Sequence, residues 1–224
     1  TGVNGCVWLD ATGRLDNVMQ PDRMGADLSL DGRIADAAPI ARAFLSPADM
    51  KSVRIPAMTL AGNVRMRDGS DMAARLTART GGGSLALDGS YAMRGDAYRA
   101  EVDADAFPVN AFMPLLGVGS VTGRVEASGH GFDFFSPSTA LTCRADVESA
   151  EYGGHRYTGI AATAVVVDGK ADVSITSADP SALADVSARG NLAGDTLSWE
   201  LYADAHRIDL KGLGMGEAET TLSG

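Results

Sequence analysis

Apolar and polar residues alternate along most of this chain, which is the pattern of a β-strand whose successive side chains point to opposite faces. Three runs show the alternation well: 84–94, 171–175 and 196–204. The apolar positions that share one face of these runs are Leu85, Leu87, Tyr91, Met93, Val173, Ile175, Leu197, Trp199 and Leu201. We expect these side chains to lie on the apolar face of a sheet.

Turn signals separate the alternating runs. Asp-Gly, which suits the positive φ angles of a two-residue hairpin turn, occurs at Asp31-Gly32, Asp68-Gly69, Asp88-Gly89 and Asp168-Gly169. The pair at 168–169 is the best hairpin signal, whereas alternation continues through 88–89 and favours a bulge or bend there. The sequence predicts about twelve strands, at the roughly 8–14-residue spacing of an antiparallel meander.

Helical signals are few. Ala38–Leu45 and Val109–Leu116 are short candidates, and Pro114 interrupts the second of them. A parallel βαβ architecture needs a helix in each crossover, so the sequence favours an all-β fold. We expect an extended, curved, mainly antiparallel sheet over residues 1–224, taken as a single β-rich domain with one or two short helices. A β-sandwich is the alternative.

Composition supports strands and tight turns. The chain has 22 Asp but 7 Glu, 16 Arg but 3 Lys, and 27 Gly; Asp and Gly favour turns, whereas Glu and Lys are good helix formers. The net charge of −10 argues against nucleic acid as a partner and against electrostatic attraction to anionic membranes. No run reaches about 18 apolar residues, the length of a membrane-spanning helix. We expect a piece of a longer chain whose targeting or anchoring segments lie outside it.

Catalytic and metal-binding motifs are missing from the sequence. His130, His155 and His206 each stand alone, without the spacing of a zinc site. Asp103 and Asp105 alternate along one strand face, where a carboxylate pair of a glycosidase is the functional hypothesis and a solvated face the simpler one. The sequence therefore predicts a protein that is not an enzyme and binds no metal or cofactor.

Other short motifs have plain structural interpretations. Arg94-Gly95-Asp96 spells an adhesion tripeptide, but it also reads as a hairpin turn. The stretch 131–139 holds Phe132, Phe134 and Phe135 without a basic residue, which favours core packing or a loop plug over a nucleic-acid platform. Cys6 and Cys143 could pair in an oxidising compartment, although buried thiols are the simpler interpretation.

The apolar strand faces need a cover, because an exposed apolar sheet is unstable in water. A sandwich supplies its own cover. A single curved sheet around an apolar groove fits as well, and such a groove would hold acyl chains, since burial contributes about 0.8 kcal/mol per CH₂. The sequence leaves both architectures open, and with them a lipid conduit and a cell-surface binding or adhesion module.

The order of the motifs resembles the repeating unit of the AsmA-like and TamB-like envelope proteins of Gram-negative bacteria. Gly82–Pro114 gives a Gly-Gly start, two strands and an apolar segment that ends in Pro. Gly119–Asp133 follows as a strand with regularly spaced Gly and Val. Ala150–Ile160, a hairpin and 175–180 continue the same cadence. The resemblance covers roughly residues 80–200.

This resemblance implies a periplasmic groove of taco-like shape with a hydrophobic interior. Proteins of this group are anchored in the inner membrane by an N-terminal helix, which this sequence does not contain, and are implicated in moving phospholipid to the outer membrane. TamB-like members also assist outer-membrane protein assembly with a β-barrel partner, whose contact region would lie in parts of the chain not present. The implied function is a non-enzymatic lipid-transfer conduit or scaffold in outer-membrane biogenesis.

Overall fold

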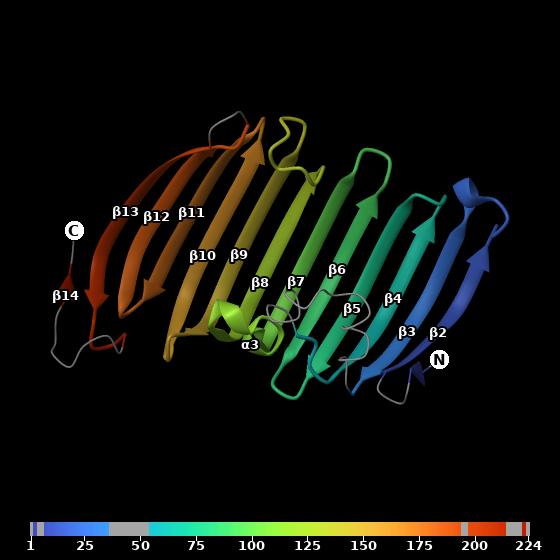
Figure 1. Cartoon of the computed structure of the whole chain (residues 1–224), viewed down its shortest axis with the longest axis horizontal. Helices are drawn as coiled ribbons and strands as arrows, with labels where there is room; N and C mark the ends of the chain where they lie inside the picture. The colour runs from blue at the N-terminus through green and yellow to red at the C-terminus, as the bar shows by residue number, and fades with distance from the viewer. Residues whose placement is uncertain (1, 4–6, 36–53, 194–196, 214–220, 223–224) are drawn as a thin grey trace. The chain divides into compact units, whose positions relative to one another are not determined.

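A computed structural model describes residues 2–3, 7–35, 54–193, 197–213 and 221–222. These residues form an all-β, antiparallel sheet of fourteen strands whose spatial order is the order of the sequence (Figure 1). The strands are β1 (Gly2–Val3), β2 (Val7–Asp16), β3 (Gly25–Ile34), β4 (Met58–Arg67), β5 (Asp71–Thr80), β6 (Ser84–Ala92), β7 (Ala97–Pro108), β8 (Val118–His130), β9 (Ala140–Tyr152), β10 (His155–Val167), β11 (Lys170–Asp179), β12 (Ala182–Asn191), β13 (Ser198–Asp209) and β14 (Thr221–Leu222). The predicted all-β meander is therefore confirmed. The sheet is open in its strand order, and the strands themselves curve, most visibly β12 and β13.

The chain divides into two compact units. The first comprises residues 1–94 and 102–122, and the second comprises 95–101 and 123–224. Strands β7 and β8 each contribute residues to both units. The expectation of a single domain stays a prediction, and the two units are described separately below.

The turns follow the sequence signals where the backbone requires positive φ. Asp68 and Gly69 have φ angles of 47° and 58°, and Asp168 and Gly169 have 50° and 67°, which is the backbone of the expected two-residue hairpins. Gly95 and Asp96 form the turn between β6 and β7, with φ of 94° and 49°. Asp31-Gly32 and Asp88-Gly89 lie inside β3 and β6, so these two pairs make no hairpin turn.

The first unit has an apolar face and a polar face. Because antiparallel partners share a face, the registers of β2–β6 place a single set of side chains together. The larger residues of this apolar face are Val7, Leu9, Leu15, Leu28, Leu30, Ile34, Met58, Leu60, Val64, Met66, Met72, Leu76, Leu85, Leu87 and Tyr91. The positions between them carry most of the charges. Ion pairs there join Arg65 to Asp27 at 3.2 Å and Arg75 to Asp88 at 2.6 Å.

The second unit repeats this division across β9–β13. Its apolar face combines aliphatic residues with many alanines. These residues are Leu141, Cys143, Ala145, Val147, Ile160, Ala162, Ala164, Val166, Ala171, Val173, Ile175, Ala184, Val186, Ala188, Trp199, Leu201 and Ala203. The opposite face again carries ion pairs, such as Arg189 with Asp172 at 3.0 Å.

One predicted helix is present and is as short as Pro114 requires. Helix α3 (Val109–Phe112) ends before Pro114, and a single 3-10 turn, η2 (Pro114–Leu116), follows it. Phe112 of α3 stacks on Phe107 of β7 with ring centroids 4.7 Å apart. The other candidate, Ala38–Leu45, lies outside the described residues.

Substitution of Gly62 tests whether the backbone of the first unit requires a glycine at this position. Its φ of 154° lies where side chains are rare, and a Cβ would collide with the Arg75 carbonyl oxygen of β5. We expect Gly62→Ala to lower the free energy of unfolding by about 1–3 kcal/mol, measured by urea denaturation followed by circular dichroism. The control is Gly81→Ala, where a Cβ meets nothing within 4 Å. Equal stability of the two variants would contradict the strain.

Candidate functional site

Three of the residues predicted to line a groove lie on the apolar face of the first unit. Leu87 lies opposite Leu76, Leu85 opposite Ala78, and Tyr91 opposite Met72. Met93 differs from the prediction. It lies in the turn after β6, where its N–H donates to the Ser70 carbonyl at 3.0 Å and its side chain is half exposed, because the strand has already ended at Ala92.

The apolar face of the second unit receives most of the others. Val173 lies between Ala164 of β10 and Ala188 of β12, and Leu201 follows in the same row on β13. Ile175 lies in the neighbouring row. The Trp199 ring covers Gly190, where a Cβ would stand 2.7 Å from it. Leu197 precedes the first residue of β13 and is exposed, so it lies at the end of the face rather than on it.

Neither apolar face is sealed by a second layer in the described part of the chain. No described side chain is fully buried, and the buried hydrophobic residues among them are Val166, Ala171 and Leu213. Trp199 and Leu201 are each more than half exposed. A packed sandwich core contains many side chains with almost no exposure. The described residues therefore form an amphipathic single sheet and not the alternative sandwich.

The chemistry of these faces is that of a hydrocarbon-binding surface. The rows across β9–β13 and β2–β6 contain aliphatic, small and a few aromatic side chains, with the charges directed to the other side. Such a surface gains about 0.8 kcal/mol for each CH₂ that it removes from water, without any directional contact. Such a surface can shield alkyl chains from water.

Two shallow hollows lie on the opposite, polar face of the second unit. One is lined by Ser174, Thr176, Asp185, Ser187 and Tyr202, together with neighbouring residues of β12 and β13, and has a volume of about 560 Å³. The other, also about 560 Å³, lies further along the same strands beside Arg189 and Asp172. Neither was indicated by the sequence, because a hollow depends on how neighbouring strands curve together.

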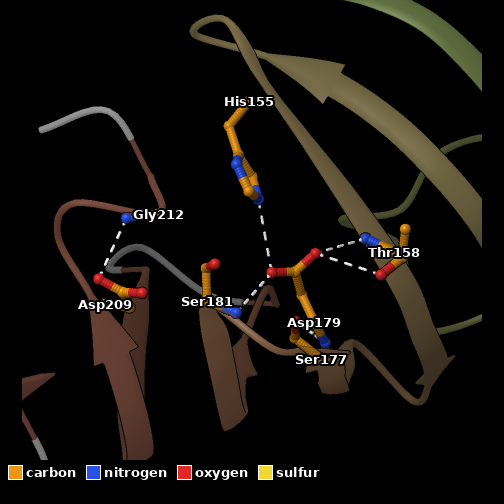
Figure 2. Close-up of polar contacts among 7 residues, drawn as sticks. All are labelled: His155, Thr158, Ser177, Asp179, Ser181, Asp209 and Gly212. Carbon is orange, nitrogen blue, oxygen red and sulfur yellow. Dashed lines mark hydrogen bonds and ion pairs between the residues drawn. The ribbon is translucent and has the colours of Figure 1, made fainter.

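A buried carboxylate, also missed by the sequence analysis, holds one end of the second unit. Asp179, the last residue of β11, is only 2% exposed. Figure 2 shows its polar contacts. Its Oδ2 accepts hydrogen bonds from the Thr158 N–H at 2.9 Å and the Thr158 hydroxyl at 3.2 Å. Its Oδ1 accepts from the Ser181 N–H at 2.9 Å and lies 3.4 Å from Nε2 of His155.

The Asp179 cluster links β10 to the turn between β11 and β12. Thr158 and His155 belong to β10, and Ser181 begins the return to β12. The Ser181 carbonyl in turn accepts from the N–H of Asp209 at 2.9 Å, and Asp209 Oδ1 accepts from the Gly212 N–H at 3.1 Å, a bond also drawn in Figure 2. This cluster fastens one end of the second unit through hydrogen bonds.

Burial and hydrogen bonding act on Asp179 in opposite directions. Burial raises the pKa of the carboxyl, but the hydrogen bonds from Ser181, Thr158 and His155 outweigh it, so the pKa lies below its ordinary value. A carboxyl with a depressed pKa in the folded state stabilises the fold above its unfolded pKa. That contribution is lost as the pH falls through the folded pKa.

The remaining sequence candidates stay apart from one another. His206 lies 2.8 Å from Asp185 on the polar face, and that hydrogen bond, with the nearby charge of Asp204, raises its pKa. Asp103 and Asp105 lie on β7. No group of three or more potential metal ligands occurs among the described residues. Within the same residues, no helix has the length and apolar character needed to cross a bilayer.

One of the two cysteines lies among the described residues. Cys143 is a partly buried free thiol on the apolar face of β9. Cys6 lies outside the described residues.

Comparison of the chain with protein-family models, with curated proteins and with solved structures finds no match.

Substitution of Asp179 tests how much its hydrogen bonds stabilise the second unit. We expect Asp179→Asn to lower the free energy of unfolding by about 2 kcal/mol at neutral pH, because buried hydrogen bonds to a charged acceptor are lost. The acid dependence of stability should also flatten in the variant, as measured by urea unfolding at a series of pH values. Asp172→Asn, at an exposed ion pair, is the control and should change little. An unchanged acid limb in Asp179→Asn would contradict the assignment.

Proposed function

We propose that this chain is a non-enzymatic conduit or scaffold that shields the acyl chains of phospholipid against the apolar faces of its sheet. The observation that supports this most directly is a continuous apolar face, in each unit, without a covering layer among the described residues. An apolar surface of this extent in a folded protein usually has a partner.

The dimensions of each face suit an acyl chain. Five neighbouring strands, β2–β6 or β9–β13, span four gaps of about 4.8 Å, or about 19 Å. The acyl layer of one membrane leaflet is about 15 Å thick, half of a hydrocarbon core of about 30 Å. An extended alkyl chain can therefore lie along the apolar rows of either unit and exchange water contact for aliphatic contact over most of its length.

The mechanism proposed here is passive. The apolar face takes up the alkyl chains, the head group stays in water, and exposed ion pairs such as Arg75 with Asp88 keep the reverse face hydrated. Because hydrophobic contact is not directional, a lipid can slide from row to row without breaking a specific bond. The sheet supplies a path, and the concentration of lipid at its ends sets the direction of net movement.

The setting is part of the same proposal and depends on the resemblance to AsmA-like and TamB-like proteins. We propose on this basis that the chain lies in the periplasm, as part of an inner-membrane-anchored protein that contributes to outer-membrane biogenesis. An outer-membrane β-barrel partner would be contacted by other parts of that protein. The alternative, a binding or adhesion module, was tied to a β-sandwich, and the single sheet favours the conduit over it.

Val173 and Ser174 give a matched pair for testing this function, because they are neighbours in β11 that point to opposite faces. We expect Val173→Asp to abolish phospholipid co-purification, measured by native mass spectrometry, since a carboxylate in the apolar row cannot be desolvated by an alkyl chain. Ser174→Asp, on the polar face, should retain the lipid.

Circular dichroism of both variants separates loss of binding from loss of folding. A native-like spectrum for Val173→Asp is expected, because an uncovered face leaves the new carboxylate in water when no lipid is present. Unfolding of Val173→Asp would indicate a closed core. Wild-type protein that carries no lipid and extracts none from vesicles would reject the conduit.

A further inference from the structure

The connection between β8 and β9, residues 131–139, exposes an unusual amount of aromatic surface in the second unit. Phe132, Phe134 and Phe135 are 61%, 38% and 61% exposed. These rings, which the sequence predicts to pack in a core or plug an opening, are instead exposed to solvent. Exposed rings this close together mark an interaction surface more often than a packing defect.

Hydrogen bonds fix the shape of this connection. The Gly131 N–H donates to the Asp96 carbonyl at 3.1 Å, and Thr139 at the other end is buried. Between them, the Phe135 N–H donates to Asp133 Oδ1 at 3.1 Å, and the Ser136 N–H donates to the Asp133 carbonyl at 2.9 Å. The rings are therefore presented by an ordered turn.

The three rings have different roles in the loop. Phe132 stacks on Tyr98 of β7, with ring centroids 5.0 Å apart and planes inclined by 18°. This stacking attaches the start of the loop to the sheet. Phe134 and Phe135 lie beyond that attachment, in the tightly hydrogen-bonded turn, so their rings can be replaced without removing the stack.

Other exposed apolar residues occur at the same end of the unit. Leu141 is opposite Val166, so β9 begins beside Val167, and the last row continues through Lys170, Asn191 and Ser198. Val167 is 50% exposed, and Leu197, next to Ser198, is 55% exposed. Figure 1 shows the β8–β9 and β10–β11 connections at this end. We define the apolar rim as Phe134, Phe135, Val167 and Leu197.

The opposite end of the same strands carries polar clusters, together with the exposed ring of Tyr152. It carries the Asp179 cluster and the turn at Asp209, whose carboxylates accept backbone hydrogen bonds. The two ends of the second unit therefore differ in chemistry: one exposes apolar side chains, and the other holds hydrogen-bonded carboxylates. From β9 to β13 the rim extends over four strand gaps, or about 19 Å.

We propose that the apolar rim docks the second unit on a lipid bilayer, with Phe134 and Phe135 inserted among zwitterionic head groups. Phe and Leu side chains of surface-bound amphipathic elements are buried at the boundary between head groups and acyl chains. Side chains spread over several connections fit a broad, deformable surface better than they fit one pocket of a protein. A lipid surface is therefore the occupant that the geometry favours.

The charges near the rim select the type of lipid. Asp133 is the only charged residue of 131–139, and its carboxylate already accepts the Phe135 N–H. Asp168 and Lys170 in the adjacent turn offset one another, and the chain as a whole carries −10. Because no cationic cluster is present in this part of the unit, docking depends on burial of apolar surface, and anionic lipid should weaken it.

This inference goes beyond the proposed function and does not depend on it. Docking uses the ends of the strands, whereas shielding of acyl chains uses their faces. If the protein binds vesicles but carries no lipid, the docking proposal stands and the conduit proposal fails. If the protein co-purifies with lipid but does not bind vesicles, the conduit proposal stands and the docking proposal fails.

The test is co-flotation with phosphatidylcholine vesicles. We expect the double variant Phe134→Ser, Phe135→Ser to lower the partition constant about tenfold or more, since two rings would otherwise leave water on docking. The matched control is Tyr152→Ser with Tyr202→Ser, which removes two exposed rings of the same unit away from the rim. This control should bind as the wild type does.

A fluorescence measurement locates the inserted residue. In a Trp8→Phe, Trp199→Phe background, Phe135→Trp should shift its emission to the blue on addition of vesicles and be quenched by brominated lipid. Replacing part of the phosphatidylcholine by phosphatidylglycerol should reduce binding at low salt.

Three results would overturn the docking proposal. They are absence of vesicle binding by the wild type, equal losses in the Phe and Tyr double variants, and loss of binding in Val173→Asp but not in the Phe double variant. The last result would place the contact on the apolar face of the sheet and not on the rim.

Discussion

Neighbouring side chains of a strand point to opposite faces, so a sequence that alternates strictly over many strands must produce a sheet with two chemically different surfaces. In this chain the separation is kept from β2 to β6 and again from β9 to β13. The polar surface is solvated and crossed by exposed ion pairs, which add little stability. The apolar surface has no second layer in the described residues. That uncovered surface is the feature of the molecule that most needs a partner.

A sheet without a packed core needs other contacts to hold its strand ends. The two ends of the second unit have different contacts. At one end, Asp179 concentrates hydrogen bonds from β10 and from the turn to β12 on one buried carboxylate. Such a carboxylate tolerates burial only because several donors compensate for its lost hydration. At the other end, an ordered turn exposes Phe134 and Phe135. Hydrogen bonds therefore close one end of the second unit, whereas the other end leaves aromatic rings exposed.

The sequence predicts the local features of this fold well and its long-range ones poorly. Alternation identifies Leu87 and Val173 as face residues, and Asp168-Gly169 identifies a hairpin, because both signals act within a few residues. Strand ends are less certain, so Met93 and Leu197 fall beyond the strands to which they were assigned. The Asp179 cluster was not predicted at all. It depends on a register that brings Thr158 beside a residue 21 positions later, and no local pattern encodes that pairing.

The size of the apolar side chains bears on what covers them. Two stacked sheets lie about 10 Å apart, and large side chains must interdigitate to fill that gap. In the second unit the central rows instead mix aliphatic residues with alanine: Val173 lies between Ala164 and Ala188, whereas Ile175 lies between Ala162 and Val186. A second protein layer over such rows would leave voids, each of which costs stability. A flexible alkyl chain can settle between Val173 and Leu201 over the intervening alanine, because its own bends adapt to the relief. The alanine-rich rows therefore favour a mobile hydrocarbon over a rigid protein layer as the cover of this face.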